Sequence, residues 1–448
     1  MVKISRNIIV FIALFLVLNL TACGQKSIPK AECDSVLPYL AHLDNLRPLV
    51  EEKYGFISID SNILHFDTAS ASMRFLLDKW LRVVAEGQES LNIVQIGSSH
   101  VQAGVFPHRI RCNILQAYPD RVGERGYIFP YSAAAKCNNP YDYKVHCKES
   151  VALTRCVYKE PEVALGVGGI AVTFHDSLST VQVVNNERRF DFHTRQVVPI
   201  GEWVCDSAHF GACPDAPEVS LTKDSFEVRF PCDSVWSYNL RGFFLKGSSQ
   251  GFTYHSIGVN GAALSDYCRC PFFCRDLKLL SPDLVIFGIG INDASGPNFD
   301  TAVFRQNYLR LIDSIRTVSP HCAFIFITNN DSFRKVRRNR YEVNKNGLLA
   351  REVFYRLAQE TGGAVWDQFE VMGGLKSMDK WRLAKLAKAD RVHFTREGYE
   401  LLGDLLSQAL LRVLYDDAKK HIDNASKKTK TTSANINTKQ SFTPIPQY

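Results

Sequence analysis

The pattern of apolar and polar positions divides the chain into segments of different periodicity. Helical spacing of apolar residues predicts helices at about 71–86, 301–317, 346–361 and 399–414. Short apolar runs predict strands at 93–96, 284–289, 322–328 and 364–366. The run at 284–289 is continuously apolar, which is typical of a strand buried on both faces. Strands that alternate with helices of this length predict an α/β fold, with a parallel sheet covered on both sides.

The interval from about 120 to 250 interrupts this alternation. Apolar residues there recur with period two, as in 218–221 and 226–230, between Pro and Gly positions and without a helical pattern. We therefore expect an inserted, sandwich-like β-domain at 119–249. It divides the α/β domain into a first part, 35–118, and a second part, 250–415.

The N-terminus has the features of a targeting segment. Lys3 and Arg6 precede an apolar run from Ile8 to Leu18, which is too short to span a bilayer, and Leu20-Thr-Ala-Cys23 follows. Small residues before a cysteine resemble a lipobox. The resemblance implies a signal peptide at 1–22, a lipid on Cys23, a tether at 23–34 and attachment to a bacterial membrane. By family analogy this is the outer membrane, with the protein facing the periplasm or the surface. The alternative is a plain secretory signal with a chance cysteine.

The net charge of +7 comes mostly from the two ends. Lys3 and Arg6 lie in the predicted signal peptide, and six lysines against one aspartate follow residue 418. The remaining body is close to neutral, so we expect no nucleic-acid partner. The polar, lysine-rich segment 416–448 has the composition of a disordered tail.

The chain contains thirteen cysteines, an unusual number for a reducing compartment. Cys268, Cys270 and Cys274 form a local group that suggests a metal site, but no second pair with zinc-ligand spacing follows them. We therefore favour disulfides in an oxidising periplasm, and we expect no metal.

Two short motifs, far apart in the chain, combine a hydroxyl with an acid and an imidazole. Gly97-Ser-Ser99-His100 follows the strand predicted at 93–96, and Asp390-Arg-Val-His393 lies near the last helix. A serine is a poor nucleophile until a base accepts its proton. An aspartate three residues before a histidine can hold Nδ1 and leave Nε2 for the serine. Each motif alone is weak, because serine pairs often cap helices and such Asp-His pairs often form surface turns.

Two further positions suit an oxyanion hole. The backbone N–H of Gly261 and the side-chain amide of Asn292 each follow an expected strand end. Ligands collect at the carboxyl ends of parallel strands, and donors aimed at an oxyanion lower the barrier of acyl transfer. The order of nucleophile, oxyanion donors, acid and base therefore predicts a serine esterase.

At these residues the chain resembles the SGNH (GDSL-type) esterase and lipase family over about 35–118 and 250–415. The resemblance implies a flavodoxin-like three-layer fold without a metal or cofactor. It makes Ser99 the nucleophile and His393 the base, oriented by Asp390. Its oxyanion hole comprises the N–H of Ser99, Gly261 and Asn292. The context around Ser99 is similar to branches of bacterial envelopes that include peptidoglycan and polysaccharide O-acetylesterases, some with an inserted β-domain.

The chain departs from the family at Ser98, where an aspartate is usual. This leaves Ser98 as an alternative nucleophile, although the register favours Ser99. His100 is interpreted as a packing or supporting residue, since adjacent side chains on a turn diverge.

The expected reaction is removal of an O-acetyl or another small acyl group from cell-envelope or other polysaccharide. The alternatives are acyl transfer to a sugar hydroxyl and a non-catalytic carbohydrate-binding lipoprotein that retains the fold; a lipase or thioesterase is a weaker option.

Overall fold

The computed structural model describes residues 44–87, 89–118, 123–134, 137, 139–147, 151–176, 179–186, 194–205, 212–247, 250–338 and 340–437. The predicted signal peptide, Cys23 and the tether lie outside these residues. Within the described part, no helix combines the length and the apolar character needed to cross a membrane.

A seven-stranded sheet forms the centre of the α/β domain, in the order β1-β18-β15-β14-β2-β13-β3. All neighbours in it are parallel except β1 and β18. The strands are β1 (Leu64–Phe66), β2 (Ser90–Gly97), β3 (Gly123–Glu124), β13 (Gly251–Gly258), β14 (Leu284–Gly288), β15 (Ala323–Ile327) and β18 (Ala364–Trp366). The order of the five main parallel strands is that of flavodoxin-like folds. The predicted fold class is confirmed.

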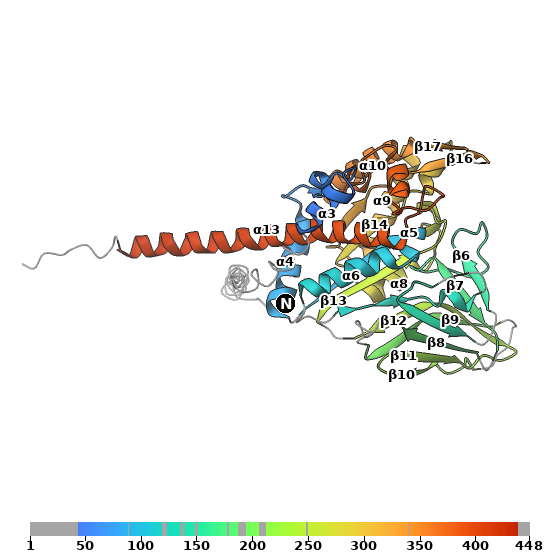
Figure 1. Ribbon diagram of the computed structural model, residues 1–448. Helices are drawn as coiled ribbons and strands as arrows, with labels where there is room; N and C mark the ends of the chain where they lie inside the picture. The colour runs from blue at the N-terminus through green and yellow to red at the C-terminus, as the bar shows by residue number, and fades with distance from the viewer. Residues whose placement is uncertain are drawn as a thin grey trace, which may run out of the picture.

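Both faces of this sheet are covered by helices (Figure 1). In β14, Leu284 and Ile286 pack into one buried cluster, whereas Val285 and Phe287 pack into the other. This alternation explains the continuously apolar run, because each face needs its own apolar side chains. The first cluster contains α4 (Ala71–Glu86), α6 (Val105–Ala117) and α13 (Arg396–Asn437); the second contains α8 (Phe273–Leu280), α9 (Thr301–Val318) and α10 (Asn346–Thr361).

The shorter elements connect these layers. They are α3 (Leu46–Lys53), η1 (Ile59–Ser61), α5 (Ser99–Gln102), η2 (Tyr131–Ala133), α7 (Leu264–Tyr267), η3 (Asp293–Ser295), β16 (Phe333–Arg337), β17 (Arg340–Val343), α11 (Gln368–Val371) and α12 (Ser377–Leu383).

Helix α13 differs from the sequence prediction. We expected a disordered tail from residue 416, but the helix continues to Asn437 and projects beyond the body of the protein (Figure 1). Its first turns are packed on α6 and α4, so the helix is already nucleated, and each further residue adds a hydrogen bond at little entropic cost. Residues 438–448 lie outside the described part.

The segment between β3 and β13 forms two antiparallel sheets, in agreement with the predicted inserted β-domain. One has the order β10-β11-β8-β5, and in the other β12 pairs with β4, β7 and β9, while β6 pairs with β7. Phe174 and Phe230 stack between the sheets at 4.4 Å. The strands are β4 (Tyr127–Ile128), β5 (Tyr143–Cys147), β6 (Ala152–Arg155), β7 (Ile170–Phe174), β8 (Ser179–Asn185), β9 (Gln196–Cys205), β10 (Glu218–Leu221), β11 (Ser225–Phe230) and β12 (Trp236–Lys246).

A buried ion pair joins this inserted domain to the α/β domain. Arg241 on β12 donates from Nε to Asp276 on α8 at 2.8 Å, and both side chains are almost fully buried. Removing one member of such a pair leaves a buried charge without a partner, so the pair fixes how the two domains are joined.

The cysteines also differ from expectation. No disulfide joins the cysteines of the described residues, which run from Cys112 to Cys322. The prediction of disulfides is therefore not met for this part of the chain. Most of these thiols are fully or partly buried, where a cysteine packs as a small apolar side chain.

Candidate active site

Ser99 lies at the carboxyl edge of the parallel sheet, at the start of α5. Three glycines stand side by side at this edge, since Gly97 pairs with both Gly258 and Gly288. A Cβ on Gly97 would lie 2.2 Å from Val101, and one on Gly258 would lie 2.4 Å from the backbone nitrogen of Gln102. The missing side chains therefore let α5 pack directly across the strand ends and present Ser99.

The structure brings the predicted nucleophile, base and acid into one chain of hydrogen bonds. Ser99 Oγ lies 2.8 Å from His393 Nε2, and His393 Nδ1 lies 2.8 Å from Asp390 Oδ2. These are the two contacts that a serine hydrolase triad requires. The serine and the histidine come from segments 294 positions apart.

Asp390 is held in its ionised form. Its partial burial alone would raise the pKa of the carboxyl group. Hydrogen bonds from the side chain and backbone N–H of His393 and from the N–H of Val392 outweigh that effect and hold the pKa below its usual range. An ionised Asp390 keeps the proton of His393 on Nδ1, which leaves Nε2 free to accept a proton from Ser99.

The turn that carries Asp390 and His393 has strained backbone. Arg391 adopts φ 59°, a left-handed conformation that is uncommon for a residue with a Cβ. Its carbonyl accepts a hydrogen bond from the N–H of Phe333 at 3.2 Å, and its guanidinium lies over the rings of Phe333 and Tyr341. The hairpin β16–β17 thus stabilises the turn, a role that the sequence pattern did not reveal.

The alternative nucleophile, Ser98, is placed differently. Its side chain is fully buried, and its Oγ has no hydrogen-bond partner among the described residues. Ser99 is the serine whose hydroxyl reaches His393. The geometry favours Ser99 for the role.

Gly261 and Asn292 lie on neighbouring loops beyond β13 and β14. Gly261 has φ +82°, which explains the glycine, and the space next to it is open. Asn292 donates from Nδ2 to the carbonyl of Ala262 at 2.9 Å. An amide nitrogen has two hydrogens, so this contact fixes Asn292 against the Gly261 loop and leaves one hydrogen for a ligand.

Two residues that the sequence reading missed hold the Gly261 loop. The side-chain oxygen of Gln102 accepts a hydrogen bond from the N–H of Asn260 at 2.7 Å, and Arg155 of the inserted domain donates to the carbonyl of Asn260. The peptide groups next to Gly261 are thus fixed from α5 on one side and from β6 on the other. No local pattern could have indicated this, because Arg155 is 105 positions from its acceptor.

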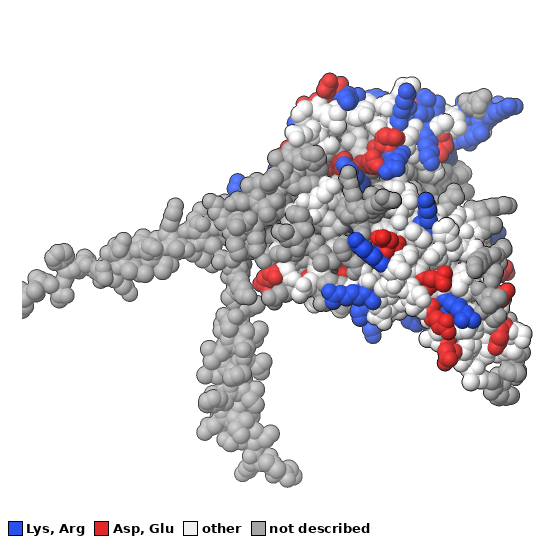
Figure 2. Space-filling model, turned by 60° about the horizontal axis from the view of Figure 1, so that its bottom comes forward, with Lys and Arg blue, Asp and Glu red and all other residues white. Residues whose placement is uncertain are grey.

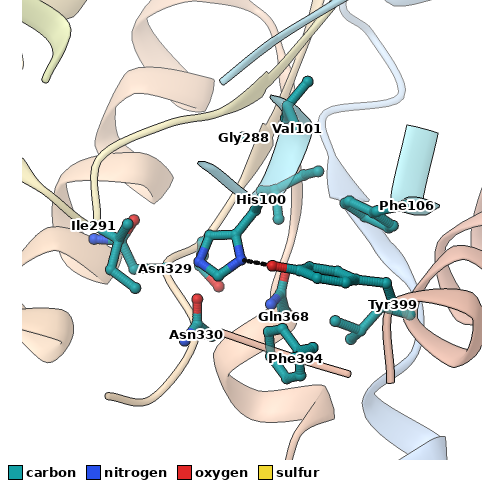
Figure 3. Close-up of a pocket in the computed structure, with 13 residues that line it drawn as sticks. His100, Val101, Phe106, Gly288, Ile291, Asn329, Asn330, Gln368, Phe394 and Tyr399 are labelled. Carbon is teal, nitrogen blue, oxygen red and sulfur yellow. Dashed lines mark hydrogen bonds between the residues drawn. The ribbon is translucent and has the colours of Figure 1, made fainter. Parts of the chain in front are cut away.

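His100 lines the pocket drawn in Figure 3, where its ring points toward the hydroxyl of Tyr399. Its Nδ1 lies 2.8 Å from the hydroxyl of Tyr399, and its ring centre lies 5.2 Å from that of His393. Burial lowers the pKa of His100 to about 3, so its imidazole is neutral at ordinary pH. A cavity of about 30 Å³ lies beside His100, and Asn329 and Gln368 also line it. His100 therefore has the supporting position expected from the sequence.

Asp293, next to Asn292, has an environment unlike that of Asp390. Burial raises the pKa of its carboxyl group to about 6, despite hydrogen bonds from the N–H of Leu264.

In the described residues no group of three His, Cys, Asp or Glu side chains is arranged to hold a metal.

Comparison with known proteins agrees with this geometry. Residues 241–401 match the profile of the GDSL-like Lipase/Acylhydrolase family. A solved peptidoglycan O-acetylesterase superimposes with a TM-score of 0.61 at 19% identity, over 79% of this chain and 99% of that one. Two other solved structures match less of the chain. A lipase/acylhydrolase from Enterococcus faecalis has 23% identity and a TM-score of 0.29, over 38% of this chain and 78% of that one. An acetyl xylan esterase has 18% identity and a TM-score of 0.28, over 35% of this chain and 79% of that one. A search of curated proteins gave no significant match.

The fold is that of SGNH hydrolases, and the protein is a carboxylic ester hydrolase by its fold and its match to acylhydrolases. Over residues 241–401 the chain is similar to the GDSL-like lipases and acylhydrolases, the class that its two motifs and two oxyanion positions predicted.

Proposed function

We propose that the protein removes O-acetyl groups from peptidoglycan or a related cell-envelope polysaccharide through an acyl-enzyme on Ser99. The observation that carries this proposal is the hydrogen-bonded chain from Ser99 through His393 to Asp390. The low pKa of Asp390 supports it, because the acid must stay ionised while His393 carries a second proton.

In the first half of the reaction, Ser99 Oγ attacks the acyl carbon and gives its proton to His393 Nε2. The oxyanion that forms accepts hydrogen bonds from the N–H groups of Ser99 and Gly261 and from the free amide hydrogen of Asn292. When the intermediate collapses, the bond to the sugar oxygen breaks. His393 returns the proton to that oxygen, and the acyl group stays on Ser99.

In the second half, water attacks the acyl-serine while His393 accepts a proton from it. The same donors stabilise the second oxyanion, and its collapse releases acetate and restores the Ser99 hydroxyl. Capture of the acyl group by a sugar hydroxyl in place of water would give the transferase alternative.

The peptidoglycan neighbour supports the substrate class, because it shares the overall fold across nearly its whole length. We infer from the sequence that a lipid on Cys23 attaches the protein to the cell envelope, next to such a polymer. Loss of labelling by a palmitate analogue in Cys23→Ala is the expected result, and labelling that persists would contradict the anchor.

The first test compares hydrolysis of p-nitrophenyl acetate by the wild type, Ser99→Ala and Ser98→Ala. Loss of Ser99 is expected to lower kcat by about 10⁵–10⁶-fold, as in other triads, whereas Ser98→Ala should remain active. Unchanged hydrolysis by Ser99→Ala would remove Ser99 from its role. A wild type that binds polysaccharide but hydrolyses no ester would favour the non-catalytic alternative.

The second test identifies the polymer. Acetate release from O-acetylated peptidoglycan should exceed release from acetylated xylan at equal acetyl content. The opposite ranking would exclude the proposed substrate.

A further inference from the structure

A surface rich in cations surrounds the turn that carries Asp390 and His393. It consists of the hairpin β16–β17 (333–343) and the segment 376–391, and we call it the basic surface. These segments contain eleven Lys and Arg residues and three Asp and Glu residues, a net charge of +8 against +7 for the whole chain. The body of the protein is close to neutral as a whole, so these two segments form a local excess of positive charge beside the candidate active site.

The two segments form one continuous surface. Arg391 packs over the rings of Phe333 and Tyr341, and the N–H of Met378 donates to Asp331, just before the hairpin. In Figure 2, Lys and Arg side chains gather at the upper right, where β16 and β17 project in Figure 1. The hairpin begins a few residues after β15, at the same sheet edge as Ser99.

Most of these cations have no internal partner. Arg340 pairs with Glu342, and Arg382 and Arg391 share Asp379. Within the described part of the chain, no carboxylate pairs with Arg334, Lys335, Arg337, Arg338, Lys385 or Lys388. The Nε of Arg334 is buried and also lacks a hydrogen-bond partner there. A buried guanidinium donor without an acceptor is costly unless a ligand supplies one.

Backbone conformation adds a second, independent observation. Among the described residues, four that are not glycine have positive φ, and three of them lie in the basic surface: Lys376 (69°), Lys385 (63°) and Arg391 (59°). Glycine adopts these conformations without strain, whereas a residue with a Cβ is disfavoured in them. Long cationic side chains therefore occupy positions where they reduce stability, which is typical of a functional surface.

We propose that the basic surface binds the carboxylates of an acidic, O-acetylated glycan and holds the chain with an acetyl group over Ser99. This rests on the proposed function and narrows its substrate to a polymer that carries carboxylates. Arginine suits this role, because its planar fork pairs with a carboxylate through two parallel hydrogen bonds. Lys385 and Lys388 precede the turn of Asp390 and His393, Arg391 lies within it, and His393 contacts Ser99. A chain bound to these cations therefore lies close to the candidate nucleophile.

Charges that only keep an edge hairpin soluble would have no effect on turnover. The test therefore uses Arg337→Gln/Arg338→Gln in the full chain, with Arg310→Gln/Arg356→Gln on α9 and α10 as a matched control. The substrates are O-acetylated peptidoglycan fragments with free stem-peptide carboxylates, the same fragments after amidation, and p-nitrophenyl acetate. Initial rates of acetate or nitrophenol release are measured at low and high salt.

We expect the hairpin variant to raise KM for the carboxylated fragments about three- to tenfold without a change in kcat, and to weaken the salt dependence. Its rates on amidated fragments and on p-nitrophenyl acetate should equal those of the wild type, and the control should match the wild type throughout. Equal KM values for the hairpin variant and the wild type on carboxylated fragments would overturn the proposal. Binding of both proteins to vesicles that contain anionic lipid is measured alongside. A defect of the hairpin variant confined to vesicle binding would also overturn the proposal and would assign the surface to a membrane.

Co-sedimentation with insoluble O-acetylated peptidoglycan, carrying either free or amidated stem-peptide carboxylates, separates this proposal from the proposed function. The Ser99→Ala protein binds without turnover, so it measures the surface alone. Preference of this protein for carboxylated polymer would support the basic surface even if the wild type released no acetate. Equal binding of both polymers would refute the surface even if acetate were released.

Discussion

The two sides of the candidate active site are built in different ways. On the triad side, Asp390 and His393 come from one four-residue turn, and their contact is local. On the oxyanion side, the position of Gly261 depends on Gln102, on Arg155 of the inserted domain and on the loop of Asn292. A short motif can thus specify the proton-transfer pair. The candidate donors for the oxyanion are placed by contacts between distant segments, and Arg155 of the insertion holds one of these loops.

The largest effect after loss of Ser99 should come from Asp390→Asn. The change keeps the size of the side chain but removes the charge that fixes the tautomer of His393. We expect kcat for p-nitrophenyl acetate to fall about 10⁴-fold with little change in KM. Retention of more than a tenth of the wild-type activity would mean that the triad side is not the centre of the reaction.

Asn292→Ala should remove one of the candidate hydrogen-bond donors to the oxyanion. Loss of one oxyanion donor costs about 10²–10³ in kcat elsewhere, or about 2.7–4 kcal/mol of barrier. The rate of Ser99 acylation in single-turnover experiments is the measurement. A loss confined to KM would show that Asn292 binds substrate in its ground state and does not stabilise the oxyanion.

Arg155→Gln should produce a smaller effect on the same side. Without the guanidinium, the carbonyl of Asn260 loses its contact with the inserted domain, and the Gly261 loop becomes less ordered. We expect kcat to fall about tenfold, or about 1.4 kcal/mol, while thermal stability changes little. Arg229→Gln, an exposed change on β11 of the inserted domain, is the control. A large drop in melting temperature for Arg155→Gln would indicate a structural role instead.

The smallest expected effect is on the pH dependence of stability, in which Asp293 and Asp390 should behave differently. The pKa of Asp293 is raised to about 6, so its ionisation costs stability, and that cost appears as the pH rises from about 4 through 6. The pKa of Asp390 is lowered, so its contribution is present above the usual pKa and disappears in acid. Asp293→Asn should therefore stabilise the protein by about 1 kcal/mol at pH 8 and not at pH 4. Equal melting-temperature shifts at both pH values would contradict this.

Much of the fold followed from periodicity. The segments 71–86 and 364–366 are the helix and strand that their patterns predict, because burial on one face of a helix or on both faces of a strand leaves a signature. The disordered tail predicted from residue 416 is not what the structure has up to Asn437, where α13 ends. Composition alone could not indicate this, because the helix is nucleated by packing of its earlier turns. The expected disulfides are not seen among the described cysteines. The number of cysteines is related to the redox compartment, whereas a disulfide also requires two cysteines that lie close together in the fold.

The sequence by itself determined the set of candidate catalytic residues: a serine after a strand, an Asp-x-x-His turn, and a glycine and an asparagine at strand ends. These are local features, fixed by the few residues around each position. Only the tertiary structure decided that Ser99 and not Ser98 faces His393, that Arg155 holds the loop of Gly261, and that β16–β17 stabilises the turn at Arg391. Each of these depends on contacts between segments far apart in the chain, and their geometry is set by how the sheet, its helices and the insertion pack together.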